Sequence, residues 1–139
     1  MHKQFSGWIL VMILVLVLSG CTPKDPLDQP LEGSFSDLAS AFVAELAAED
    51  FDAAYGYFNK TMREAISKEQ LTDLWGDLID QVGAYKEEVT QVQTAQDGFD
   101  IIIVTAQFEV TYLDIRVVFD SDHRVAGLFF QASSYTPGS

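Results

Sequence analysis

The chain has 139 residues and a formal net charge of −13, from 21 acidic and 8 basic side chains, with one cysteine and two histidines. Such an acidic surface repels nucleic acid and anionic lipid headgroups, so we expect neither as a partner. One cysteine excludes an intramolecular disulfide bond. The chain also lacks the phosphate-binding glycine loop, the calcium loop and the cysteine cluster of common cofactor and metal sites, so no cofactor and no metal are expected.

Residues 1–20 have the layout of a secretory signal peptide. A short positive head containing Lys3 precedes an apolar run from Trp8 to Leu18. As a helix at about 1.5 Å per residue, that run reaches about 16 Å, roughly half of a hydrocarbon core about 30 Å thick, which disfavours a permanent membrane span. Removal of the whole signal peptide, residues 1–20, leaves 119 residues, with 7 basic against 21 acidic side chains and a balance of −14. This length favours one folded domain.

Cys21 ends the sequence Leu18-Ser19-Gly20-Cys21, which is typical of a lipoprotein processing site. Cleavage before Cys21 would make it the new N-terminal residue, and lipidation of its thiol with two or three acyl chains would give a stable anchor. The alternative is an incidental cysteine behind an ordinary signal peptide. We expect the lipid-anchored form, held at the extracytoplasmic face of the cell membrane.

Residues 22–34 hold three of the four prolines and no aromatic residue. This composition is typical of a semi-extended tether, which would span roughly 40 Å at about 3.3 Å per residue. With the lipidated cysteine, the tether covers residues 21–34. The folded domain is predicted over residues 35–132, followed by a tail at 133–139.

Three helices are predicted next. The first begins near Phe35, with Ser34 and Ser36 as candidate N-caps, and the second follows Asp50, which can cap it. The third begins at Ser67, since Ser67 and Gln70 form a capping-box pattern, and ends before Gly83. Their apolar stripes contain Leu38, Phe42, Val43 and Leu46, then Phe51, Ala54, Tyr55 and Phe58, then Leu71, Leu74, Trp75, Leu78, Ile79 and Val82. The opposite face of the third helix carries carboxylates that we interpret as solvated.

After Gly83 the apolar period changes to two, which predicts strands. The first runs from Tyr85 to Gln96, and Asp97-Gly98 is a strong hairpin turn. A long return strand reaches Tyr112, a bend is predicted at Leu113-Asp114, and the third strand covers 115–120. A turn at 121–123 leads into a fourth strand over 124–131. Helices on one side of a bent antiparallel sheet give an α+β cone of about three helices and about four strands.

Several of these segments resemble the domain of unknown function 3887 family, in the nuclear transport factor 2-like superfamily. The similar residues are Ala41-Phe42-Val43 to Glu49-Asp50-Phe51, Leu71-x-x-Leu74-Trp75, Val82-Gly83, Val117 to Asp120 and Val125 to Phe130. The resemblance covers residues 36–131 and implies a cone of helices wrapped by a bent sheet. Many relatives carry this domain ahead of an α/β-hydrolase. This chain stops at Ser139 without a Gly-x-Ser-x-Gly nucleophile motif, so the resemblance implies no hydrolase activity and no catalytic residues here.

Few residues offer catalytic chemistry. His123 lies in a predicted turn beside Asp120 and Asp122, where a solvated turn residue is a simpler interpretation than a triad or metal ligand. Asn59-Lys60-Thr61 matches the N-glycosylation pattern, whose use depends on the organism. Glu109 and Arg116 are the candidate polar pair, expected as a cross-strand salt bridge or an exposed pair.

The superfamily often has a pocket between the sheet and the long helix. By that resemblance, five aromatic residues are its candidate lining: Tyr55, Trp75, Phe108, Tyr112 and Phe130. Such a pocket would suit a small apolar ligand. The alternative is that these aromatic rings only fill the core.

We therefore expect a non-enzymatic, membrane-anchored module that binds a partner protein or a small ligand through the open end of the cone. One alternative is an enzyme, or an accessory domain of a separately encoded α/β-hydrolase. Glu109 and Tyr112 are the nearby carboxylate and hydroxyl, but strand alternation sends them to opposite faces. Another alternative is a homodimer formed through Ile101, Ile103 and Val118, if helices leave them uncovered.

Overall fold

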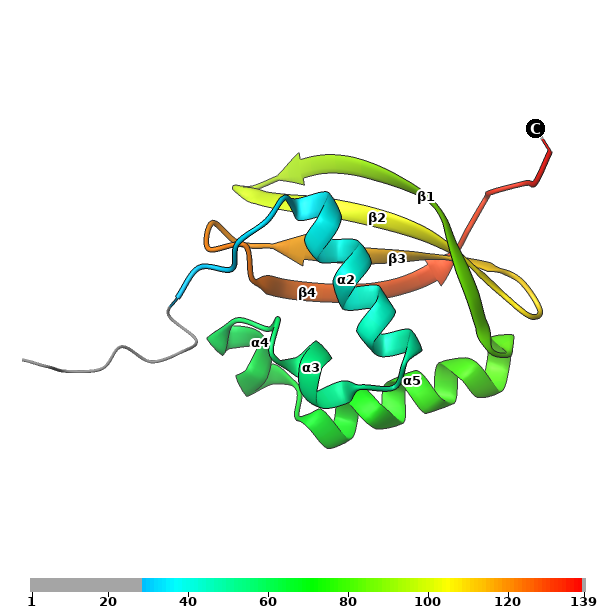
Figure 1. Ribbon diagram of the computed structural model, residues 1–139, viewed down its shortest axis with the longest axis horizontal. Helices are drawn as coiled ribbons and strands as arrows, with labels where there is room; N and C mark the ends of the chain where they lie inside the picture. Colours follow the sequence, from blue (N-terminus) through cyan, green and yellow to red (C-terminus); the bar gives the residue numbers. More distant parts are fainter. Residues whose placement is uncertain (1–28, 139) are drawn as a thin grey trace, which may run out of the picture.

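The computed structural model describes residues 29–138, so the signal peptide and Cys21 lie outside the described residues. Four helices come first: α2 (Phe35–Ala47), α3 (Phe51–Tyr55), α4 (Lys60–Ala65) and α5 (Lys68–Val82). Four strands follow: β1 (Tyr85–Gln96), β2 (Phe99–Phe108), β3 (Tyr112–Phe119) and β4 (Val125–Ala132). The strands form one antiparallel sheet in chain order, with α2 lying across it and α5 beneath it (Figure 1). The predicted α+β class is confirmed.

The helix starts follow local capping signals. Ser34, one of the two candidate caps, accepts a hydrogen bond from the Asp37 N–H at 3.1 Å. Asp50 caps α3, and both hydrogen bonds of the Ser67–Gln70 capping box are present at the start of α5. Within residues 29–138, no helix is both long and apolar enough to cross a membrane.

Helix α4 was not expected, since about three helices were predicted. Its sequence, Lys-Thr-Met-Arg-Glu-Ala, has no apolar stripe that would signal a helix. Two contacts support it instead. Asn59 caps its first turn by accepting from the Met62 N–H at 2.8 Å, and the Tyr55 hydroxyl donates to the carbonyls of Arg63 and Ile66 at its end. This helix therefore depends on its neighbours in space.

The predicted bend at Leu113-Asp114 is wrong, because the turn between β2 and β3 lies earlier in the chain. The chain reverses over residues 109–111, and the third strand begins at Tyr112, three residues earlier than expected. The Val110 N–H donates to the Val82 carbonyl and the Glu109 N–H to the Ala84 carbonyl, so the turn docks on the corner between α5 and β1. Val110 is apolar and continues the alternation, so the sequence pattern extended the strand through it. In the structure its side chain is 73% exposed.

The last part of the predicted tether contacts the domain. The Leu31 N–H donates to the Asp122 carbonyl at 2.9 Å, and the Gln29 carbonyl accepts from the Arg124 guanidinium. From residue 29 onward, the segment is thus held against the β3–β4 turn.

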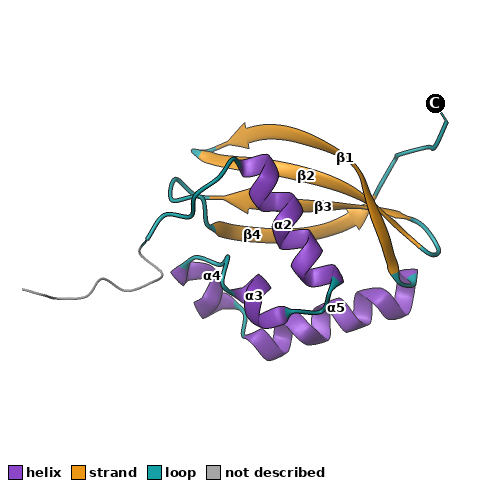
Figure 2. Ribbon diagram, in the orientation of Figure 1, coloured by secondary structure: helices purple, strands orange, loops and turns teal. Residues whose placement is uncertain are grey.

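The core lies between the helices and one face of the sheet (Figure 2). Alternate residues of β2 and β3 point into it and are almost fully buried, and α2 covers them with its own apolar stripe. Core members from the sheet include Ile102, Val104, Phe108, Ile115, Val117 and Phe119. The face of the sheet away from the helices is therefore a separate surface.

Gly83, at the corner between α5 and β1, has a φ of +82°. A Cβ there would stand 2.6 Å from the Glu109 Cβ, whereas Gly98 has a similar φ of +85° and nothing within 4 Å. We expect Gly98→Ala to lower the free energy of unfolding by about 1–2 kcal/mol through backbone strain. Gly83→Ala should cost clearly more, because Glu109 must also move. Urea denaturation measures the free energy of unfolding of both variants. Equal losses of stability would contradict the close approach of Gly83 to Glu109.

Candidate functional site

The five aromatic residues predicted to line a pocket lie in three places. Trp75 packs against Phe108 and Phe130, with its ring centroid 6.0 and 6.2 Å from theirs. The Tyr55 ring lies against Phe58, and Tyr112 packs on Tyr135. The structure thus brings together three of the five: Trp75 and Phe108 are almost fully buried in the core, whereas Phe130 is half-buried and packs against it.

A cavity of about 190 Å³ lies near the carboxyl end of α2, and Trp75 is the one predicted residue that lines it. The others are Ala47, Glu49, Ile79, Ala84 and Tyr85. Burial, and then the negative charges of Glu88 and Glu87, raises the pKa of the Tyr85 phenol above its ordinary value. The cavity is smaller than the roughly 300–1,000 Å³ typical of ligand sites.

The structure does not bring Glu109 and Arg116 together. Glu109 lies in the β2–β3 turn against Gly83, whereas Arg116 lies in β3 opposite Ile103. Six positions separate Ile103 from Glu109, which is about 20 Å of strand at roughly 3.3 Å per residue. The Arg116 guanidinium instead donates to the Gln96 side chain at 3.4 Å. The expected salt bridge depended on the misplaced bend.

The outward side of the sheet, which we call the helix-free face, carries an apolar patch. It contains the half-buried Ile103 of β2 and Val118 of β3, and Val118 lies opposite Ile101, which shares this face but is only 3% exposed. Three of its apolar side chains are well exposed: Val92 at 56%, Phe99 at 40% and Phe129 at 57%. These residues converge on one surface, although they come from all four strands.

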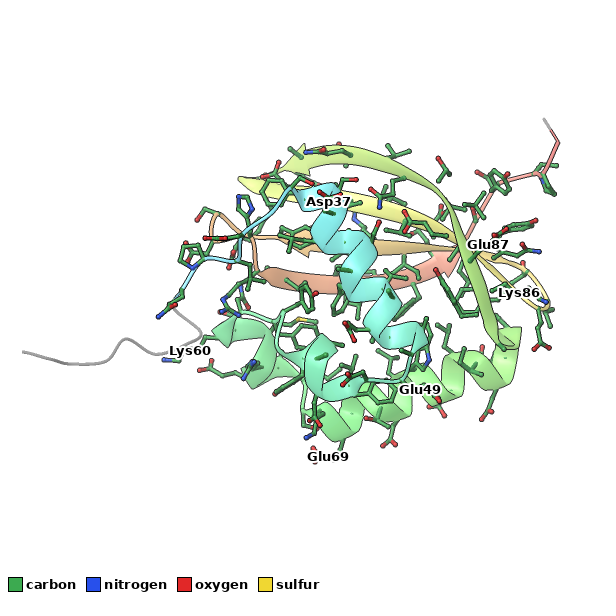
Figure 3. All side chains as sticks on the ribbon, viewed as in Figure 1. Asp37, Glu49, Lys60, Glu69, Lys86 and Glu87 are labelled. Carbon is green, nitrogen blue, oxygen red and sulfur yellow. The ribbon has the colours of Figure 1, made fainter. Side chains whose placement is uncertain are left out.

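Charge is sparse on the part of the helix-free face that β2, β3 and β4 form, whereas Glu87 of β1 and Asp97 of the β1–β2 turn lie at its margins. Among the outward positions of β2, β3 and β4, the charged residues are Asp114 and Arg116, and the Asp114 carboxylate accepts a hydrogen bond from Thr105. By contrast, α5 alone carries Glu69, Asp73, Asp77 and Asp80. Figure 3 shows Glu69 pointing away from the sheet. In a chain with 21 carboxylates, this uneven distribution sets one face apart.

Two grooves flank β4. The face groove, of about 530 Å³, lies on the helix-free face and is lined by Gln96, Asp97, Phe99, Ile101, Arg116, Val118, Phe129, Phe130 and Gln131. The α5 groove, of about 330 Å³, lies between α5 and β4 and is lined by Leu74, Asp77, Leu78, Gln81, Leu128, Phe129 and Phe130. Both grooves share Phe129 and Phe130. Phe130 was among the predicted pocket-lining residues, but the grooves themselves were not predicted, because they depend on which strand lies at the sheet edge.

A buried polar cluster at the β3–β4 turn was also missed. The Arg124 side chain is 6% exposed and donates to the carbonyls of Gln29, Gly56 and Phe58. Asp120 accepts from the backbone N–H groups of Asp122 and Arg124 and from the Asn59 amide. The run of polar residues at 120–124 resembles an ordinary solvated turn in the sequence. Its role here is to hold the turn, the tether and the α3–α4 connection together.

His123 and Asn59 are engaged in these local contacts. His123 lies in the expected turn, with Nδ1 2.9 Å from the Gly33 carbonyl oxygen and its ring 4.2 Å from the Phe35 ring. Asn59 uses its oxygen to cap α4 and its amide nitrogen to donate to Asp120. Among residues 29–138, no group of three or more His, Cys, Asp or Glu side chains could hold a metal ion.

Comparison with known proteins finds a relative that aligns over part of its length and a family whose model matches the chain. The chain is 27% identical over 104 residues to Esterase EstD of Thermotoga maritima, an alignment that covers 75% of this chain and 25% of that protein. The chain therefore spans about a quarter of the length of this relative. No solved structure matches the chain. The model of the family described as Protein of unknown function (DUF3887) matches residues 39–128, more than half of the chain, and the chain belongs to that family.

Proposed function

We propose that this chain is a non-catalytic binding module whose binding surface is the helix-free face. The main supporting observation is the face groove on an apolar, charge-poor side of an otherwise acidic protein. Interface centres in proteins are depleted in charge and enriched in aromatic residues and arginine. Phe99, Phe129 and Arg116 fit that composition, whereas the 190 Å³ cavity at the end of α2 offers little room.

The arrangement of acid–base groups supports the non-catalytic assignment. A general base needs its carboxylate within about 2.6–3.2 Å of the proton donor it serves. Glu109 lies in the turn against Gly83, and Tyr112 packs on Tyr135 beyond that turn. The carboxylate and hydroxyl considered from the sequence therefore lie in separate surroundings.

The fold and location of the module belong to the same proposal. We assign the α+β domain to the nuclear transport factor 2-like superfamily, supported by the four helices on one side of the antiparallel meander. We place it on the extracytoplasmic face of the cell membrane, anchored through lipidated Cys21, because of the Leu18-Ser19-Gly20-Cys21 sequence. Intact-mass measurement of the membrane form tests this placement, and an unmodified Cys21 would contradict it.

A second candidate function is an accessory domain of a separately encoded α/β-hydrolase. The relative in Thermotoga maritima carries the name esterase, and the matched region makes up a quarter of it. In that case the helix-free face would contact the hydrolase. A third candidate is a homodimer through the same face, favoured by the exposed Phe99 and Phe129, whereas Ile101, one of the three residues expected there, is only 3% exposed.

Native mass spectrometry of the full chain, purified from its host membrane in a mild detergent, tests the binding surface. We expect a bound species, either a small molecule or a second polypeptide, on the wild type. Phe129→Asp should lose it, because a carboxylate would then be buried in the apolar groove. Val110→Asp is the matched control, since Val110 is exposed but lies at the β2–β3 turn. The proposal would be contradicted if the wild-type chain carried no bound species, or if Phe129→Asp retained the species.

A further inference from the structure

The two edges of the sheet differ in how they are protected. The β1 edge carries Lys86, Glu87 and Glu88, and its register shifts twice, between Tyr85 and Glu87 and between Glu88 and Thr90. Charges and bulges of this kind prevent an edge strand from pairing with another chain. The β4 strand has no charged side chain from Val125 to Ala132, and its ladder is regular after the shift at its start.

Backbone hydrogen bonding shows which groups β4 leaves at its outer edge. The Ser133 N–H donates to the Tyr112 carbonyl, so the backbone N–H and C=O of Ser133 point toward β3. The same holds for Gln131, Phe129 and Gly127, which precede it at even spacing up to the register shift. At the start of β4, a bridge to Phe58 covers the outer side of Val125. Beyond that bridge, no strand of residues 29–138 pairs with the outer edge. The groups that point there are the N–H and C=O of Leu128, Phe130 and Ala132.

The two grooves lie on either side of this open edge. Phe129 is exposed on the helix-free face beside the face groove, whereas Leu128 borders the α5 groove. Successive side chains of a strand point to opposite faces of its sheet. A strand added along β4 would therefore place alternate side chains in the two grooves, and apolar side chains would suit both.

The charges beside the edge indicate the chemistry of the added strand. Asp77 lines the α5 groove, and Asp73 and Asp80 lie four and three residues away on the same helix. A second copy paired β4 to β4 would bring two such rows of carboxylates toward each other, which is unfavourable. A basic residue on the incoming strand would instead complement Asp77.

We propose that an extended segment of a partner protein, with apolar residues at alternate positions and a lysine or arginine facing Asp77, adds a fifth strand along β4. This inference rests on the proposed function and specifies how the binding surface is used. Main-chain hydrogen bonds to Leu128, Phe130 and Ala132 would supply affinity, and the two grooves would supply selectivity.

The probe is a library of random decapeptides displayed on phage, selected against the full chain in a mild detergent. We expect the selected peptides to alternate apolar residues and to contain lysine or arginine. Binding of a synthesised peptide should slow amide hydrogen exchange at Leu128 and Phe130, measured by NMR on the wild-type chain. Selected peptides without alternation, or unchanged exchange at both amides, would overturn strand addition.

A matched pair of variants tests the main-chain contact. Ala132 is exposed, so Ala132→Pro removes one edge N–H without loss of packing, whereas Ala132→Ser keeps that N–H. We expect Ala132→Pro to weaken peptide binding about tenfold and Ala132→Ser to leave it unchanged. Asp77→Asn should weaken binding of the basic peptide and not of its glutamine-substituted form. Equal binding by the two Ala132 variants would overturn the inference.

The two proposals fail in different ways. If Phe129→Asp removes the native bound species while both Ala132 variants retain it, the helix-free face remains the binding surface and strand addition is wrong. If the wild-type chain carries no bound species, the proposed function fails, and the slowed exchange at Leu128 and Phe130 still decides whether β4 accepts a strand.

Discussion

Replacing Trp75 with alanine should lower the free energy of unfolding by about 3–5 kcal/mol, the range for large-to-small substitutions of buried aromatic residues. Trp75 is 2% exposed, and its ring contacts Phe108 from β2 and Phe130 from β4. It therefore holds α5 against two strands at once. Removing it leaves a cavity that a helix and a sheet can close only in part.

Leu74→Ala is the control for this prediction, because Leu74 is the preceding residue of α5 and is 40% exposed. Both substitutions introduce alanine into the same helix, so helix propensity hardly separates them. We expect Leu74→Ala to cost about 1 kcal/mol or less. Urea denaturation of the full chain, followed by circular dichroism, measures both. Similar losses would show that Trp75 does not carry the packing between α5 and the sheet.

Replacing Arg124 with methionine should cost about 3 kcal/mol or more, because buried carbonyls that lose a charged donor are expensive to leave unpaired. The guanidinium donates to Gln29, Gly56 and Phe58, which belong to the tether and to the α3–α4 connection. Methionine keeps much of the side-chain volume, so the loss reports on hydrogen bonding more than on packing.

Arg116→Met is the matched control, since Arg116 is half-buried and its hydrogen bond to Gln96 is long, at 3.4 Å. We expect that change to stay within about 0.5 kcal/mol. Urea unfolding midpoints of Arg124→Met and Arg116→Met measure the difference in stability between the two variants. An Arg124→Met chain as stable as Arg116→Met would contradict a structural role for the buried guanidinium.

Local signals were predictable from the sequence. The hydrogen bonds of the Ser67–Gln70 capping box join residues three positions apart, and the Asp97-Gly98 turn follows from the backbone preferences of those two residues. Both were placed correctly because nothing distant decides them.

Features set by distant contacts were not predictable. The β2–β3 turn lies where Val110 bonds to Val82, and α4 lies where the Tyr55 hydroxyl reaches its end. The error in that turn also explains why Glu109 and Arg116 were paired. Strand alternation indicated that Ile101 and Ile103 share a face, but the exposure of Phe129 beside them depends on β4 lying at the sheet edge.

Site-specific photocrosslinking in living cells tests the role of the helix-free face most directly. A photoreactive phenylalanine analogue would replace Phe99 or Phe129 on that face, and Glu69 or Val110 elsewhere on the surface. We expect covalent adducts of one defined mass from Phe99 and Phe129 and none from the other two positions. Adducts from Glu69 or Val110 alone, or none from Phe99 and Phe129, would contradict binding through the helix-free face.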